Sequence, residues 1–250
     1  MRIVIISDIH GNLAALQAVL DHADVDSADA VWCLGDIVGY GPDPNACVEL
    51  VGQHTDGNSL AGNHDYAALG KIDATDFNAD ARRATLWTRD QLSEASRSLL
   101  DGLTTRRGPF MDDYTLAHGS PRHPLWEYVL YPSVAAENFS YFDTRVCLVG
   151  HTHVPMIFRS IAGSTEIQAL SPPVDATISL GDDQDVRVII NPGSVGQPRD
   201  GDPRASYTVL DPETGDLTFH RVSYDIDATQ DRMREFGLPA RLITRLDYGW

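Results

Sequence analysis

The feature that most constrains this chain is a repeated junction, in which a short apolar run ends directly in a cluster of aspartate, histidine, asparagine and glycine. Ligands of open α/β sheets bind outside the carboxyl ends of the strands, where such clusters would lie. We therefore expect the clusters to converge on one site. Five such junctions occur, at Asp8-Ile9-His10-Gly11-Asn12, Gly35-Asp36, Gly62-Asn63-His64-Asp65, His118-Gly119 and Gly150-His151-Thr152-His153.

Apolar runs of strand length alternate with helical patterns in the first half of the chain. The continuous run at 2–6 is typical of a strand buried on both faces, and Asn12 can cap the helix that follows it. A break is expected near Leu92-Ser93, where a new cap is available. Strands are also predicted at 30–34 and 59–61, and helices at 44–51 and 77–101.

The second half is richer in strands. A hairpin is predicted around the turn sequence DPETG, and the last 25 residues look helical. Since no repeat or clear linker occurs, we expect one domain, with an α/β or α+β layered sandwich. The strands are predicted within 114–119, 145–153 and 186–190, and at 205–210 and 216–222.

The charge balance limits the partners. Of the 36 acidic residues 29 are Asp, of the 19 basic residues 18 are Arg, and the formal net charge is −17. Phosphate backbones and acidic membranes need clustered basic charge, so we expect neither stable binding of duplex nucleic acid nor membrane association. One hypothesis is adaptation to a salt-rich cytoplasm, because at about 1 M salt the Debye length falls to roughly 3 Å. Ordinary acidity kept for solubility is the alternative.

The composition, 42% hydrophobic and 22% charged, is that of an ordinary globular protein. The opening MRIVIIS runs straight into DIHGN and leaves no room for a signal-peptide cleavage region, so a cytoplasmic protein is expected. Cys33, Cys47 and Cys147 are odd in number and far apart in the sequence. We therefore interpret them as free core thiols.

The residue types of the junctions suit divalent transition metals. Imidazole together with carboxylate favours Mn, Fe, Zn, Ni or Co over calcium. In an extended segment residues i and i+2 point the same way, so Asp8 and His10 are expected to hold one ion. By the same spacing, His151 and His153 are expected to face the site.

The residues of two further junctions are expected to have different roles. Asp36, alone at its strand end, has two oxygens with which to bridge two ions. Asn63 and His64 are adjacent and should diverge, so that one is a neutral ligand while the other is free for proton transfer.

Together, Asp8-x-His10, Gly35-Asp36, Gly62-Asn63-His64-Asp65, His118 and Gly150-His151-x-His153 resemble the complete, ordered motif set of the calcineurin-like metallophosphoesterases. The resemblance runs from residue 3 to about residue 196. The segments GDIVGYGPDP (35–44) and NPGSVGQPR (191–199) resemble a compact bacterial and archaeal branch of that family. Members of that branch are often labelled phosphodiesterases or diadenosine-tetraphosphatase-like enzymes.

The resemblance implies an α/β (α+β) fold, a four-layer αββα sandwich of two mixed β-sheets flanked by helices, with residues 1–250 as a single domain. It also implies two divalent metal ions and a bridging water or hydroxide as the nucleophile. His64 is implied as the general acid, with Asp65 holding its other ring nitrogen. The implied ligands are Asp8, His10, Asp36 and His153 for the first ion, and Asp36, Asn63, His118 and His151 for the second.

Weaker candidates for contacts with substrate phosphate are Asn12, Arg122, His123 and Arg199. A helix cap is the alternative for Asn12, a surface or salt-bridge role for the two arginines, and an exposed loop for His123. Aromatic residues that would line a pocket, or else pack in the core or at an interface, are Tyr40, Trp126, Tyr128 and Tyr131.

We therefore expect a metal-dependent hydrolase of phosphodiester or phosphomonoester bonds, with Mn²⁺ foremost and Fe, Zn, Ni, Co or Mg as alternatives. Its substrate would be a small phosphate ester or a nucleotide. The alternative is a non-catalytic metal-binding interaction module on the same fold, and the presence of His64 favours the enzyme. The choice between monoester and diester, the metal and the oligomeric state are left open by the sequence.

Overall fold

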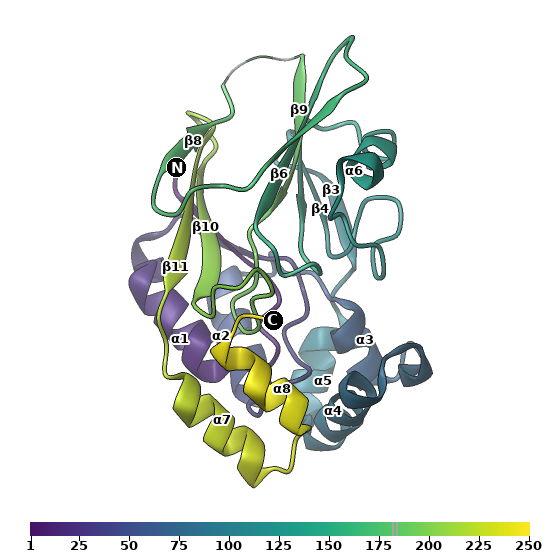
Figure 1. Cartoon of the computed structure of the whole chain (residues 1–250), viewed down its shortest axis with the longest axis vertical. Coiled ribbons are helices and arrows are strands. Elements are labelled where there is room, and N and C mark those ends of the chain that lie inside the picture. Colours follow the sequence, from purple (N-terminus) through teal and green to yellow (C-terminus); the bar gives the residue numbers. More distant parts are fainter. Residues whose placement is uncertain (182, 184) are drawn as a thin grey trace.

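Two mixed β-sheets form the centre of the molecule (Figure 1). The computed structural model describes residues 1–181, 183 and 185–250. The first sheet has the order β2-β1-β10-β11-β8 and the second the order β3-β4-β5-β9-β6-β7. The first contains β1 (Ile3–Ile6), β2 (Ala30–Cys33), β8 (Thr177–Ser179), β10 (Ala205–Asp211) and β11 (Asp216–Val222). The second contains β3 (Arg106–Phe110), β4 (Tyr114–Ala117), β5 (Val146–Val149), β6 (Met156–Ile161), β7 (Ile167–Leu170) and β9 (Val186–Asn191).

Each sheet contains parallel strand pairs, at one edge of the first sheet and in the centre of the second. In the first sheet β1 pairs with β2, with Ile6 opposite Cys33. In the second sheet β4 pairs with β5, with Ala117 opposite Val149, and β5 pairs with β9. Because parallel strands end at the same edge of a sheet, the segments that follow these strands are brought together.

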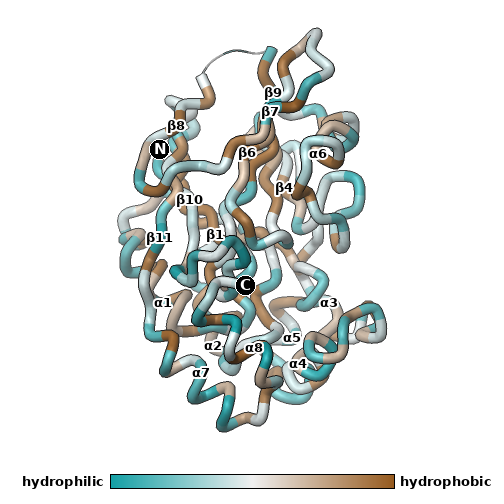
Figure 2. Tube along the Cα trace, in the orientation of Figure 1, coloured by the Kyte–Doolittle hydropathy of each residue, from teal (hydrophilic) through white to brown (hydrophobic). Residues whose placement is uncertain are grey.

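The apolar runs bury themselves between the sheets and under the helices. Ile5 and Trp32 of the first sheet and Leu148 and Ile190 of the second belong to one core cluster, and each is almost fully buried. Burying a side chain of this kind stabilises the fold by about 1.5–3 kcal/mol. Figure 2 shows hydrophobic residues along the central strands and hydrophilic ones over much of the outer helix α7 (Ile226–Glu235).

Helices cover the outer faces, as the predicted sandwich requires. A second core cluster joins the first sheet to α1 (Leu13–His22) and α2 (Pro44–Thr55), and another joins the second sheet to α6 (Pro132–Asn138). The remaining helices are α3 (Asn63–Leu69), α4 (Ala79–Gln91), α5 (Glu94–Asp101) and α8 (Ala240–Thr244), with short 3₁₀ helices at Val25–Ser27, Ala74–Asp76 and Arg245–Asp247.

The predicted helix boundaries follow the capping residues. Asn12 accepts a hydrogen bond from the backbone of Ala15, and Ser93 accepts one from Ser96. The expected break near Leu92-Ser93 is confirmed, since α4 ends before it and α5 begins after it. Among the described residues, none of the helices has both the length and the apolar character needed to cross a bilayer.

The strand predictions are wrong in two places. Residues 59–61 form only isolated bridges, between Cys33 and Ser59 and between Leu60 and Thr104, because this segment touches the sheet at single residues. The strands β3, β6, β7 and β8 lie in no predicted element. β3, β7 and β8 are largely exposed, and only Ile157 and Phe158 of β6 are fully buried, so the pairing of these strands is set by the neighbouring strand and not by a local apolar pattern.

Candidate metal centre

All five junctions meet at one edge, where the two sheets approach each other. Asp8 and His10 follow β1, and Asp36 follows β2. The sheets are joined directly, because the backbone N–H of His151, beyond β5, donates to the Asp8 carboxylate at 3.0 Å. The backbone N–H of Gly196, beyond β9, donates to the carbonyl of Asp8 at 3.0 Å. The predicted convergence of the clusters is thus present in the structure.

The backbone conformation that achieves this convergence is not the extended one expected from the sequence. Five residues of the cluster have φ between +51° and +65°, in the left-handed region: Asp8, His10, Asp36, His151 and His153. For residues other than glycine this costs of order 1–3 kcal/mol each, and such strain gathers at functional sites. The i and i+2 residues therefore share a target through tight turns, and the extended-strand reason is wrong.

Four side chains form a first group of donor atoms. His153 Nε2 lies 3.4 Å from Asp8 Oδ1, and His10 Nε2 lies 3.6 Å from Asp36 Oδ2. His10 Nε2 and His153 Nε2 face each other at 3.1 Å. One donor atom from each of Asp8, His10, Asp36 and His153 lies within 4.8 Å of the others, and all four residues are buried.

A second group shares Asp36 with the first. His118 Nε2 lies 3.3 Å from Asp36 Oδ2 and 3.3 Å from the amide oxygen of Asn63. Donor atoms of Asp36, His118 and His151 lie within 4.8 Å of one another. The first group contains the residues of the first ligand set implied by the family resemblance. The second contains Asp36, His118 and His151 of the other set, and Asn63 lies beside His118.

The tautomers that the backbone imposes fit cation binding. Nδ1 of His10 lies 3.2 Å from the carbonyl of Val38, that of His118 lies 2.9 Å from Leu34, and that of His153 faces Gln197. If each Nδ1–H donates to its carbonyl, each Nε2 lone pair is directed into the cluster. A cation would also give partners to Asp36 Oδ2 and His151 Nε2, which are buried and make no hydrogen bond within the described part of the chain. The residues present therefore fit two divalent ions.

The pKa values at the centre reflect burial and the shared carboxylate. Burial lowers the pKa of His10 and His153 well below the usual value, so both rings are neutral at pH 7. Burial also lowers the pKa of His118, but the Asp36 carboxylate outweighs it and raises this pKa to about 9. The pKa of Asp36 is held well below its usual range because the attraction of the neighbouring histidines outweighs burial. Asp36 is thus an anionic carboxylate.

His64 lies beside the centre, but Asp65 does not hold its ring. The Asp65 oxygens accept the backbone N–H groups of Val38 and Gly62, at 3.0 and 2.8 Å. The prediction that Asp65 orients His64 is therefore wrong: a residue at the third position of α3 is placed to bind backbone groups at the start of that helix. Nδ1 of His64 instead faces the Thr85 hydroxyl at 3.5 Å.

Of the four proposed phosphate contacts, two have partners within the fold and a third is an exposed loop residue. Asn12 caps α1 and donates to the carbonyl of Gly196, so its helix-cap alternative holds. Arg122 pairs with Glu127 and Glu137, which is its salt-bridge alternative. His123 is an exposed loop residue. These three residues were placed on substrate because side-chain type alone does not reveal the partner that the fold supplies.

Arg199 is the exception among these four. Its backbone N–H donates to the carbonyl of His153 at 3.3 Å, and its side chain lines a cavity of about 950 Å³. Tyr40, which is buried, and Tyr128, which is partly exposed, line the same cavity, whereas the exposed Trp126 and Tyr131 are not among its lining residues.

The sequence model of the calcineurin-like phosphoesterase superfamily domain matches residues 1–215. The chain belongs to this superfamily. A metallophosphoesterase from Sphaerobacter thermophilus, known from its crystal structure, is 47% identical over 100% of both chains, with a TM-score of 0.88. An uncharacterized protein of Methanocaldococcus jannaschii is 38% identical over 99% of this chain and 98% of its own length. A symmetrical bis(5'-nucleosyl)-tetraphosphatase of Photorhabdus laumondii is 33% identical over 36% of this chain and 38% of its own.

The superfamily and the Asp/His cluster together indicate a site for two divalent ions. The resemblance found in the sequence motifs is confirmed, as is the expected class of two mixed sheets with flanking helices.

Sequence reasoning missed two arginines that line the cavity with Arg199. Arg241 and Arg245 lie in the C-terminal helical segment, which was predicted only as helix. Their i, i+4 spacing places them on one helix face and was the signal available in the sequence.

Proposed function

We propose that this protein hydrolyses phosphoester bonds with two divalent metal ions, Mn²⁺ foremost. The observation that carries the proposal is the position of Asp36 Oδ2, which lies 3.6 Å from His10 Nε2 and 3.3 Å from His118 Nε2 and makes no hydrogen bond in the described part of the chain. One carboxylate oxygen thus faces both donor groups. A mixture of imidazole and carboxylate donors supports a transition metal such as Mn²⁺ over calcium.

Each of the two donor groups would hold one ion, with Asp36 shared between them. The first ion would be held by Asp8, His10, Asp36 and His153, and the second by Asp36, Asn63, His118 and His151. Two ions held in this way would supply Lewis acidity, which lowers the pKa of a water molecule and stabilises charge on a phosphoryl group. The backbone N–H of His64 donates to Asp36 Oδ1 at 2.9 Å and leaves Oδ2 free for this task.

His64 is proposed as the group that protonates the leaving oxygen. Its ring packs against Tyr40 at 4.3 Å and against His10 at 4.9 Å between ring centres, at the border of the donor cluster. Burial lowers the pKa of His64 to about 4, so the resting ring is neutral at pH 7. An anionic substrate beside the ring favours its protonated form, which a general acid requires.

The substrate would be a small phosphodiester, phosphomonoester or nucleotide. The printed name of the Photorhabdus relative, a tetraphosphatase, supports a nucleotide. The acidic balance of this chain, −17 overall, opposes long nucleic acids as substrates.

Hydrolysis of bis-p-nitrophenyl phosphate and of p-nitrophenyl phosphate with Mn²⁺ tests the proposal, and the ratio of the two rates reports diester against monoester chemistry. Asp36→Asn should abolish turnover. The variant should also bind at least one Mn²⁺ ion fewer per chain than the parent. Asp101→Asn, which removes the same charge from an exposed side chain, is the matched control and should retain both. Full turnover by Asp36→Asn, or metal-independent turnover by the parent chain, would refute the proposal.

The role of His64 has its own test. His64→Ala should lower the rate about 10²–10⁴-fold on an alkyl phosphodiester, whose leaving group needs a proton, while both Mn²⁺ ions remain bound. The loss should be smaller on bis-p-nitrophenyl phosphate, because nitrophenolate leaves without a proton. An equal loss on both substrates, or none on the alkyl ester, would contradict this role.

A further inference from the structure

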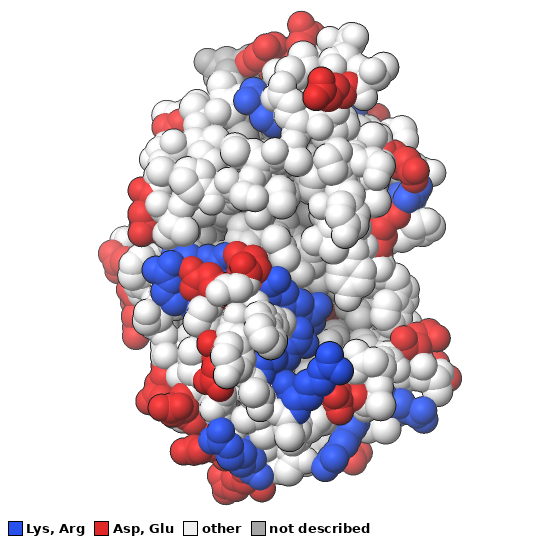
Figure 3. Space-filling model, viewed as in Figure 1, with Lys and Arg blue, Asp and Glu red and all other residues white. Residues whose placement is uncertain are grey.

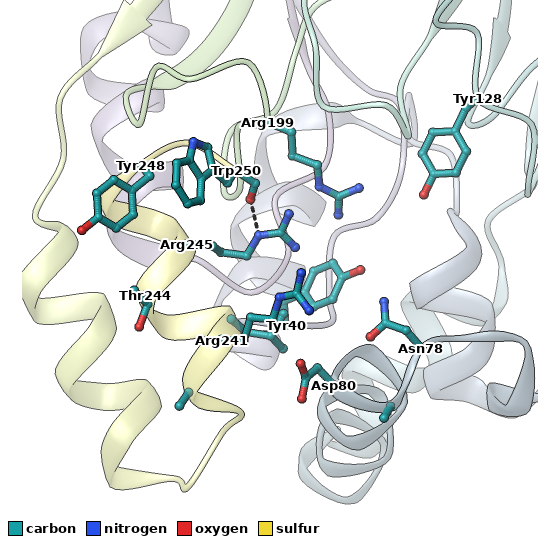
Figure 4. A pocket seen from close by; sticks show the side chains of 13 residues that line it. Tyr40, Asn78, Asp80, Tyr128, Arg199, Arg241, Thr244, Arg245, Tyr248 and Trp250 are labelled. Carbon is teal, nitrogen blue, oxygen red and sulfur yellow. Dashed lines mark hydrogen bonds between the residues drawn. The ribbon is translucent and has the colours of Figure 1, made fainter.

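A cavity of about 950 Å³ adjoins the donor cluster. Two of its lining residues contact rings of that cluster: Tyr40 lies 4.6 Å from His10, and Tyr128 stacks on His151 at 4.1 Å between ring centres. A molecule bound at the centre can therefore extend into this cavity, whose lining side chains are drawn in Figure 4.

Three arginines from two separate segments line this cavity. Arg199 follows β9 in the chain, and its backbone N–H donates to the carbonyl of His153 in the donor cluster. Arg241 lies in α8 and Arg245 directly follows it, so the two side chains share one face. Figure 4 shows the three guanidinium groups on one side of the cavity, around Tyr40.

The positive charge of the cavity arginines contrasts with the acidic composition of the chain as a whole. Figure 3 shows a cluster of basic side chains in the middle of this face, on a chain whose net charge is −17. Asp80 contributes an acid to the lining. A cluster of positive charge in a recess attracts anions far more strongly than scattered charges do.

None of these arginines forms an ion pair with an Asp or Glu of the described residues, whereas Arg204, Arg221 and Arg232 each pair with an aspartate. Arg245 Nε donates to the backbone oxygen of Trp250 (Figure 4), and Arg199 Nη2 donates to the side-chain oxygen of Gln197 at 3.0 Å. The buried Nε of Arg199 makes no hydrogen bond within the described part of the chain. Burial, followed by repulsion from Arg199, lowers the pKa of Arg245 to about 10. Guanidinium groups this close together, with no Asp or Glu paired to them among the described residues, indicate a place for an anion.

We propose that the cavity binds a second phosphate of the substrate whose scissile phosphate lies at the donor cluster. This inference rests on the proposed function and narrows its substrate class to esters with more than one phosphate, such as nucleoside or dinucleoside oligophosphates. A planar guanidinium group can donate two parallel hydrogen bonds to two oxygens of one phosphate. Three such groups suit a ligand that carries more than one negative charge. Two of the three, Arg241 and Arg245, lie beyond residue 215, where the match to the superfamily ends. The specificity is therefore assigned to the C-terminal segment of this chain.

The test compares Arg241→Gln and Arg245→Gln with Arg234→Gln. The control removes the same charge from α7, where Arg234 pairs with Asp231 outside the cavity. For the full chain in Mn²⁺, kcat/KM is measured on a dinucleoside tetraphosphate and on bis-p-nitrophenyl phosphate, which has one phosphate. Each cavity variant should lower the ratio of the two values about tenfold or more, as expected for a lost hydrogen bond to a charged group. Arg234→Gln should leave the ratio unchanged, and an unchanged ratio in both cavity variants would overturn the proposal.

A second measurement separates this inference from the proposed function. Binding of inorganic tripolyphosphate to the full chain is followed by calorimetry at constant free Mn²⁺, which needs no turnover. The cavity variants should bind tripolyphosphate about tenfold more weakly than the parent chain. Their kcat/KM on the dinucleoside tetraphosphate should fall by the same factor. If kcat/KM on the dinucleoside tetraphosphate falls while the affinity for tripolyphosphate is unchanged, the cavity recognises the nucleoside, and the proposal would be wrong. A chain without phosphoesterase activity that still shows the tripolyphosphate effect would refute the proposed function but not the phosphate-binding cavity.

Discussion

Gly62→Ala should damage the metal centre by a purely steric route. A Cβ on Gly62 would lie 2.0 Å from Asp36 Oδ1, 2.6 Å from its Cγ and 2.7 Å from its backbone nitrogen. The backbone of Gly62, with φ −101° and ψ −175°, is open to alanine, so the substitution causes no conformational strain of its own. The steric clash with Asp36 is therefore the expected cause of the damage.

The size of the effect follows from that contact. Real Cβ atoms essentially never approach closer than 3.0 Å, so Asp36 must move by about 1 Å. Ligand positions tolerate only about 0.2 Å, and lost support of a ligand typically costs about 10–100-fold in metal affinity. Asp36 contributes to both donor groups, so both ions should bind more weakly by about this factor. Overpacking should also lower the free energy of unfolding of the metal-free protein by about 1–3 kcal/mol.

Calorimetric titration with Mn²⁺ and denaturant unfolding in chelator measure these two quantities. Gly102→Ala is the matched control: the nearest atom to its added Cβ is the Leu99 carbonyl oxygen at 3.6 Å, an ordinary contact. Its φ of −76° also suits alanine, so the control should gain about 0.4–1 kcal/mol and bind Mn²⁺ normally. Two Mn²⁺ ions bound by Gly62→Ala with parental affinity would show that the position of Asp36 does not control the centre.

Three further outcomes are expected. Asn12→Ala should lower the free energy of unfolding by about 1–3 kcal/mol, because it removes the cap of α1 and the hydrogen bond to Gly196. A change below about 0.5 kcal/mol in urea unfolding would contradict the cap role. Burial raises the pKa of Glu127, but hydrogen bonds led by Arg122 outweigh it and lower the pKa to about 2. Its stabilising effect is therefore complete above the unfolded-state pKa of about 4.3 and is lost as the pH falls toward 2, so the stability difference between the parent chain and Glu127→Gln should shrink over that range. If the net charge of −17 is an adaptation to salt, the thermal midpoint should rise markedly between about 0.05 and 2 M KCl, and an unchanged midpoint would favour acidity for solubility.

What the sequence determined by itself is where the candidate donor residues lie relative to the strands. Asp8, His10 and Asp36 were singled out because they lie just after apolar runs, and a strand buried in a parallel pair needs only local hydrophobicity to be recognised. The break at Ser93 was predicted for the same kind of reason, since a helix cap is a contact between neighbours in the chain.

Only the tertiary structure decided which polar side chains remain free for a ligand. Asn12 donates to Gly196, 184 residues further along the chain, while Arg199 lines one cavity together with Arg241 and Arg245 of the C-terminal segment. These arrangements bring separate segments together, and their formation depends on how the sheets and helices pack. The pattern of residues along the sequence records the chemistry of each side chain but not its distant neighbours, and it is those neighbours that satisfy a charge or leave it available.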